Sequence, residues 1–120
     1  MRLLDSVVVI DYLNGVPGAR SYVEGTVGLF ISVVTVAEVM AGSDPADPAP
    51  VADYLGTFPV LGIDAAVARR AGRLRQTERW KLPDAFQAAI AQHHGMTLVT
   101  RNTRDFSAER HDFVLIPYVI

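Results

Sequence analysis

The sequence predicts a three-layer α/β/α domain in which a mainly parallel central sheet lies between helices. Two observations lead to this class. Short β-like runs alternate with helical stretches along the whole chain, as expected for a parallel sheet with crossover helices. The length of 120 residues and the apolar fraction of 50% are typical of one hydrophobic core, so we expect residues 1–120 to form a single domain.

In the first half of the chain we expect strands at residues 2–4 and 29–31, and helices at residues 7–13, 17–24 and 33–41. The run of β-branched residues after Ser6 favours extension locally, but Asn14-Gly15 is a helix stop and decides for a helix. Pro17 and Gly25 bracket the next helix in the usual way. Apolar residues surround the helix at 33–41, which predicts burial on most of its faces.

In the second half we expect helices at residues 51–58, 65–79 and 84–94, an extended piece at 60–62, and strands at 96–99 and 114–116. Asp64 is a suitable N-cap for the long helix, and Gly95 closes the helix that follows Pro83. Residues 43–50 contain three prolines, so we expect an irregular surface connector there.

Composition excludes several classes of protein and site. The chain has no cysteine and only three histidines, so any metal is expected to bind through oxygen. No apolar run approaches the roughly 18 residues that a membrane span needs, and the N-terminus does not read as a secretory signal, so we expect no membrane association and a cytoplasmic location. The net charge of −2 argues against non-specific nucleic-acid binding over the whole surface, but it is compatible with a local basic face.

Polar residues fall where strands end and helices begin. Asp5 follows the first strand, Asn102 follows the strand at 96–99, and Asp84 lies in the first turn of a helix. Each has a purely structural alternative. Asp5 could cap the helix that follows it, Asp84 could interact with the helix dipole, and Asn102 with Asp105 could form a turn and a cap. Glu38 lies among apolar neighbours, where an unpaired carboxylate would be costly. A shared explanation is a carboxylate cluster that binds Mg²⁺ or Mn²⁺.

Four segments in order resemble the motifs of PIN-domain ribonucleases, and in particular the VapC toxins of toxin–antitoxin pairs. They are Leu3–Leu13, Ile31–Glu38, Lys81–Ala89 and Thr97–Phe106. Their order, their spacing and the total chain length agree with that family. The resemblance implies a PIN-like fold and a metal-dependent endoribonuclease in which a metal-activated water cleaves RNA.

The resemblance also implies roles for individual residues. Asp5, Glu38 and Asp84 would bind the metal, and Asn102 or Asp105 would complete the site. Ser6 and Thr100 would orient these carboxylates or a water. Val7 stands where asparagine or serine is usual in the family, which implies a less well-oriented Asp5. The implied partners are an RNA substrate, a VapB-like antitoxin that occludes the cleft, and a second copy in a homodimer.

A basic segment precedes Asp84 and is a candidate RNA-binding surface. Its residues are Arg69, Arg73, Arg79, Trp80 and Lys81. Arg69 and Arg73 are four residues apart and share a helix face, and Trp80 could stack on a base. The alternative is a solvated arginine face with Trp80 packed in the core.

Two other functions compete with the nuclease hypothesis. A receiver-like phosphoacceptor module would also have a parallel sheet and an acidic Mg²⁺ pocket, but it needs a lysine after a late strand, and Lys81, the only lysine, precedes a helix. A catalytically weak PIN domain that acts by binding RNA or protein is the second alternative, and Val7 favours it.

Overall fold

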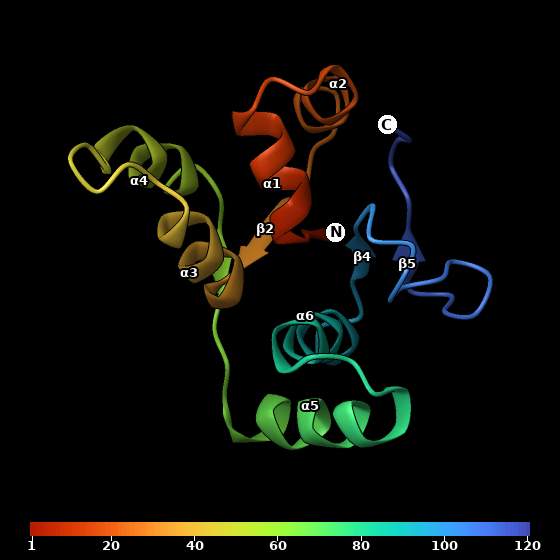
Figure 1. Ribbon diagram of the computed structural model, residues 1–120. Helices are drawn as coiled ribbons and strands as arrows, with labels where there is room; N and C mark the ends of the chain where they lie inside the picture. The colour runs from red at the N-terminus through yellow and green to blue at the C-terminus, as the bar shows by residue number, and fades with distance from the viewer.

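Five parallel strands form the central sheet of the computed structural model, which describes residues 1–120 (Figure 1). The strands are β1 (Arg2–Leu4), β2 (Leu29–Ser32), β3 (Val60–Leu61), β4 (Thr97–Val99) and β5 (Val114–Leu115). They lie in the order β3-β2-β1-β4-β5, and every neighbouring pair is parallel. The predicted parallel sheet is confirmed.

Six helices connect the strands: α1 (Ser6–Leu13), α2 (Pro17–Glu24), α3 (Val33–Ala41), α4 (Ala49–Leu55), α5 (Ala65–Glu78) and α6 (Leu82–His93). Three of them have an N-cap residue whose side chain accepts a backbone N–H. These residues are Asp5 for α1, Ser32 for α3 and Asp64 for α5. None of the six helices is both long enough and apolar enough to cross a membrane.

Alternate strand residues supply the two cores. Successive side chains of a strand point to opposite faces of the sheet. Leu3 and Leu98 therefore belong to a core with α5 and α6, whereas Leu4 and Val99 belong to a core with helices α1 to α4. Figure 1 shows α1 and α2 on one side of the sheet and α5 and α6 on the other. The predicted three-layer arrangement is confirmed.

The strand order creates a crevice beside β1. The chain runs outward from β1 through β2 to β3, and then returns to the other side of β1 for β4 and β5. Connections that leave β1 and β4 diverge at this switch point, where parallel sheets usually bind ligands at the carboxyl ends of their strands. Asp5 directly follows β1 and Thr100 directly follows β4, so both lie at the crevice.

Several predicted boundaries and one burial pattern were wrong. Helix α4 already begins at Ala49, inside the segment that we expected to be irregular, because Pro50 lies in its first turn, where no N–H donor is needed. Pro83 is accommodated in the same way in α6. Helix α3 buries only Thr35 and Val39. Its outer side is open, because its neighbours α1, α4 and α6 cover only part of the helix.

The packing of Tyr118 on α2 gives a prediction about two glycines. A Cβ on Gly18 would lie 2.9 Å from Cβ and Cγ of Tyr118, whereas a Cβ on Gly72 in α5 would meet nothing within 4 Å. We expect Gly18→Ala to lower the free energy of unfolding by about 1–3 kcal/mol through overpacking. Gly72→Ala, the matched control, should raise it by about 1 kcal/mol. Urea denaturation measures both, and equal effects would contradict this packing.

Candidate active site

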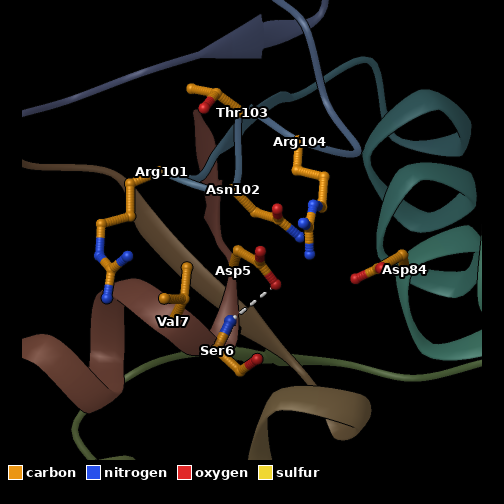
Figure 2. A pocket seen from close by; sticks show the side chains of 8 residues that line it. All are labelled: Asp5, Ser6, Val7, Asp84, Arg101, Asn102, Thr103 and Arg104. Carbon is orange, nitrogen blue, oxygen red and sulfur yellow. Dashed lines mark hydrogen bonds between the residues drawn. The ribbon is translucent and has the colours of Figure 1, made fainter. Parts of the chain in front are cut away.

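A pocket of about 290 Å³ opens at the crevice between β1 and β4 (Figure 2). Residues from the start of α1, from the first turn of α6 and from the segment after β4 line it: Asp5, Ser6, Val7, Asp84, Arg101, Asn102, Thr103 and Arg104. Figure 2 shows the carboxylates of Asp5 and Asp84 facing each other across this pocket. Two acids that are 79 positions apart (84 − 5) thus meet at one site.

Asp5 is almost completely buried, with 4% of its surface exposed. Its Oδ1 accepts the N–H of Ser6 at 2.9 Å, and its Oδ2 accepts the hydroxyl of Thr100 at 2.7 Å. Burial raises the pKa of Asp5, and the nearby charge of Glu38 raises it further, although these hydrogen bonds act in the opposite direction. The Thr100 contact is the one expected of a residue that orients Asp5.

Asp84 lies in the first turn of α6 and is half-buried. Its pKa is raised to about 6, first by burial and then by the negative charges of Asp5, Asp105 and Glu38. The four predicted acids are therefore close enough for their charges to interact. The charged form of Asp84 is therefore less favourable than that of an ordinary aspartate, and a nearby cation would offset this repulsion.

Glu38 lies at the edge of the site and not inside the pocket. The structure corrects the apolar environment that we expected, because Glu38 is exposed on the open side of α3. Its Oε1 accepts the hydroxyl of Ser6 at 3.0 Å, so Ser6 connects Glu38 to the start of α1. Glu38 lines a different hollow, together with Ile10 and Val39.

Asn102 lines the pocket, whereas Asp105 does not. The backbone N–H of Asn102 donates to Thr100 Oγ1 at 3.0 Å, and its side-chain Nδ2 donates to Asp105 Oδ2 at 3.0 Å. Asn102 thus connects Asp105 to the pocket wall, and the charge of Asp105 reaches Asp84.

A buried polar cluster that the sequence did not predict adjoins Asp5. Gln87, Ser32 and Thr35 are all 0% exposed and are hydrogen-bonded to one another. Gln87 also donates to Asp5. The available signal was a glutamine among the alanines of α6, one turn after Asp84, because a buried amide requires partners.

An ion pair that the sequence did not predict lies at the rim of the pocket. Arg101 donates to both carboxylate oxygens of Asp11, and Tyr118 Oη donates to Asp11 Oδ2 at 2.8 Å. The Arg101 hydrogen bonds hold the pKa of Asp11 below its usual value. Arg104, by contrast, is exposed and forms no ion pair, and Figure 2 shows its guanidinium reaching toward the space beside Asp84.

The expected RNA-binding residues do not form one surface with the pocket. Trp80 is 4% exposed, packs against Phe106, and donates Nε1–H to the carbonyl of Asp105 at 2.8 Å. The prediction that Trp80 stacks on a base is therefore wrong. The alternative, in which its ring packs in the core, is confirmed. Arg69 and Arg73 line a separate shallow hollow on α5.

The two remaining basic candidates lie in the turn that leads to α6. Arg79 and Lys81 are exposed there, and the charge of Lys81 acts to lower the pKa of Asp84. Lys81 precedes α6 and does not follow a late strand, so the arrangement of a receiver-like phosphoacceptor is absent.

The donor chemistry of the pocket fits a hard divalent cation, although the predicted metal-binding set of Asp5, Glu38 and Asp84, completed by Asn102 or Asp105, is not gathered around one point. No group of three or more acidic or histidine side chains is close enough to hold one metal ion. Mg²⁺, however, keeps several waters and binds through as few as two carboxylates, with substrate phosphates completing its shell. Asp5 and Asp84 supply such a pair, and the repulsion that raises the pKa of Asp84 is what a cation would relieve.

Comparisons with known proteins agree with this geometry. Residues 2–111 match the family model of the PIN domain. The chain is 35% identical to ribonuclease VapC10 of Mycobacterium tuberculosis, over 88% of this chain and 86% of that protein. A toxin–antitoxin complex from Klebsiella pneumoniae contains a chain of similar structure, with a TM-score of 0.92, 35% identity and 100% coverage of both chains.

A second solved structure has the same fold at lower identity. FitAcB from Neisseria gonorrhoeae aligns with a TM-score of 0.80 and 24% identity, over 98% of each chain. The family model covers residues 2–111, almost the entire sequence. The chain therefore belongs to the PIN-domain family.

Proposed function

We propose that this chain is an endoribonuclease toxin that hydrolyses RNA and is inhibited by a VapB-like antitoxin. The observation that carries the proposal is the pocket at the switch point of the sheet, where Asp5 and Asp84 face each other. The similarity to ribonuclease VapC10 over most of both chains supports the activity. The likeness to a toxin–antitoxin complex at 35% identity supports the partner.

The acids in the pocket are proposed to bind Mg²⁺ or Mn²⁺. Asp5 and Asp84 would hold the ion, and Glu38 and Asp105 would add negative charge around it. When bound, the ion would lower the pKa of a water nucleophile and offset the charge that develops on phosphate. Without a cation, a phosphodiester in this pocket would face the carboxylates and be repelled.

The protein's own residues position the substrate in this proposal. Arg104, which has no acidic partner, would contact an RNA phosphate. Arg101 is already neutralised by Asp11 and would shape the rim. Arg79 and Lys81, in the turn that leads to α6, and Arg69 and Arg73 on α5 are further candidates for holding RNA outside the pocket. A homodimer of single-domain subunits is part of the same proposal.

A weaker, binding-only function is the second candidate, and Val7 favours it. Val7 lines the pocket next to Asp5 and supplies no hydrogen-bond donor or acceptor there. Binding without efficient cleavage would follow if this missing polar group is needed to orient the nucleophile.

The first prediction concerns cleavage. Structured RNA should be cleaved when Mg²⁺ or Mn²⁺ is added, and EDTA should stop the reaction. Asp5→Asn and Asp84→Asn should each lower kcat by at least about 100-fold, because the ion would lose a charged ligand. Asp53→Asn, an exposed substitution on α4, is the matched control. Cleavage by both pocket variants at the wild-type rate would remove these acids from the mechanism.

The second prediction concerns stability without metal. The pKa of Asp84 is about 6 in the folded protein and near 3.8 when unfolded, so folding favours the protonated form. The free energy of unfolding should therefore decrease as pH rises from about 4 to 6. Asp84→Asn should stabilise the protein at pH 7.5 by about 1 kcal/mol after solvent screening, and should not do so at pH 3.5.

Urea denaturation in EDTA at the two pH values measures this effect. Asp64→Asn is the control of opposite sign, because the Val67 N–H lowers the pKa of Asp64. Added Mn²⁺ should stabilise the wild type more than Asp84→Asn. An Asp84→Asn protein that is less stable at pH 7.5 would indicate that Asp84 mainly serves the start of α6.

The third prediction separates the two candidate functions. Val7→Asn restores a polar group at the pocket wall, so kcat should rise by about 10-fold if wild-type turnover is limited there. Val60→Asn, at an exposed position on β3, is the control. If wild type binds RNA but cleaves none with Mn²⁺, while Val7→Asn does cleave, the binding-only function is correct.

A further inference from the structure

We infer that Gln87 is a positioning residue of the pocket, whose buried amide fixes the orientation of Asp5 and the placement of α6 that turns Asp84 toward it. The inference rests on the proposed function of this pocket. It assigns a role to a residue that does not touch the substrate and does not line the pocket.

Gln87 lies one helical turn after Asp84 on α6, so the two side chains project from neighbouring parts of the helix surface. It is 0% exposed and is followed in sequence by the buried Ala88 and Ala89. A primary amide left without hydrogen-bond partners in such surroundings would be strongly unfavourable. The amide therefore depends on its hydrogen bonds.

All of the partners of Gln87 come from other elements of the fold. Its Nε2 donates to Thr35 Oγ1 at 2.7 Å and to Asp5 Oδ1 at 3.3 Å. Its Oε1 accepts the hydroxyl of Ser32 at 2.7 Å. One side chain thus joins α6 to the end of β1 and to the start of α3, the elements that carry Asp84, Asp5 and Glu38.

The surrounding donors permit only one orientation of the amide. Ser32 Oγ accepts the N–H of Thr35 at 3.2 Å and donates its hydroxyl proton to Gln87 Oε1. The Thr35 hydroxyl donates toward the carbonyl of Leu4 at 3.5 Å, which leaves its oxygen free to accept from Nε2. A flipped amide would place Oε1 against the Asp5 carboxylate, and two acceptors would face each other.

The same contacts determine which oxygen of Asp5 remains available. Oδ1 accepts from the Ser6 N–H and from Gln87, and Oδ2 accepts from the Thr100 hydroxyl. A carboxylate has about four acceptor positions, so the remaining one lies on Oδ2. Gln87 therefore keeps Oδ1 engaged with the protein and leaves Oδ2 as the atom that meets a ligand.

The test compares two glutamines of α6 after the same substitution. Gln87→Met removes the amide at similar volume, whereas Gln92→Met changes a partly exposed glutamine that accepts from Arg70. We expect Gln87→Met to weaken Mn²⁺ binding by about 10- to 100-fold in calorimetry of the otherwise metal-free protein, and to lower kcat similarly. KM for RNA should remain unchanged, because the phosphate contacts are elsewhere. Gln92→Met should match the wild type in all three quantities.

Two further variants keep the test decisive if Gln87→Met does not fold. Thr35→Val retains the shape of the side chain but removes the acceptor that holds Nε2, and should weaken Mn²⁺ binding in the same direction. Gln87→Glu replaces the donor with an oxygen that faces Asp5, and should weaken binding at least as much as Gln87→Met.

The outcomes separate this inference from the function on which it rests. Wild-type protein that neither binds Mn²⁺ nor cleaves RNA would overturn the proposed function and the inference together. An active wild type, with folded Gln87 and Thr35 variants whose Mn²⁺ affinity and kcat are within about 2-fold of Gln92→Met, would overturn the inference alone. A loss of thermal stability with unchanged Mn²⁺ affinity would likewise show a purely structural role.

Discussion

A carboxylate buried at the end of a strand must receive from the protein the hydrogen bonds that it loses from water, and the pocket is built around this requirement at Asp5. The Ser6 N–H, the Thr100 hydroxyl and the Gln87 amide replace the lost solvent. Each donor comes from a different element, namely α1, the segment after β4, and α6. The hydrogen bonds that solvate one acid therefore also set how these elements meet.

The distribution of charge follows from the strand order. Because β1 and β4 are neighbours while their connections diverge, an opening remains above Asp5 in which the acids accumulate. Arginines lie along its rim, one held by Asp11 and one without an acidic partner. An acidic interior with a basic rim suits a phosphate chain that approaches a cation, since each part of the pocket attracts one component of the complex and repels the other.

Local patterns were sufficient for most of the fold, and they failed where burial depends on distant neighbours. The strand at 2–4 was predicted from the local sequence, as was a strand at 96–99 that the structure has at Thr97–Val99. The helix stops near Asn14 and Gly95 were predicted in the same way. Trp80 was ambiguous in the sequence, and only its contact with Phe106 decided for the core. Glu38 was expected to be buried because its sequence neighbours are apolar, yet the outer side of α3 has no element above it.

The sequence by itself determined the fold class, the order of the elements, and the acids at strand ends and helix starts, because periodicity, caps and stops are properties of neighbouring residues. The tertiary structure alone decided which acids share the pocket, that Asn102 lines it whereas Asp105 does not, and that Gln87 donates a hydrogen bond to Asp5. The Gln87 contact joins residues that are 82 positions apart. Such contacts depend on the placement of whole helices against the sheet, which is set by packing of the two cores and leaves no short-range pattern.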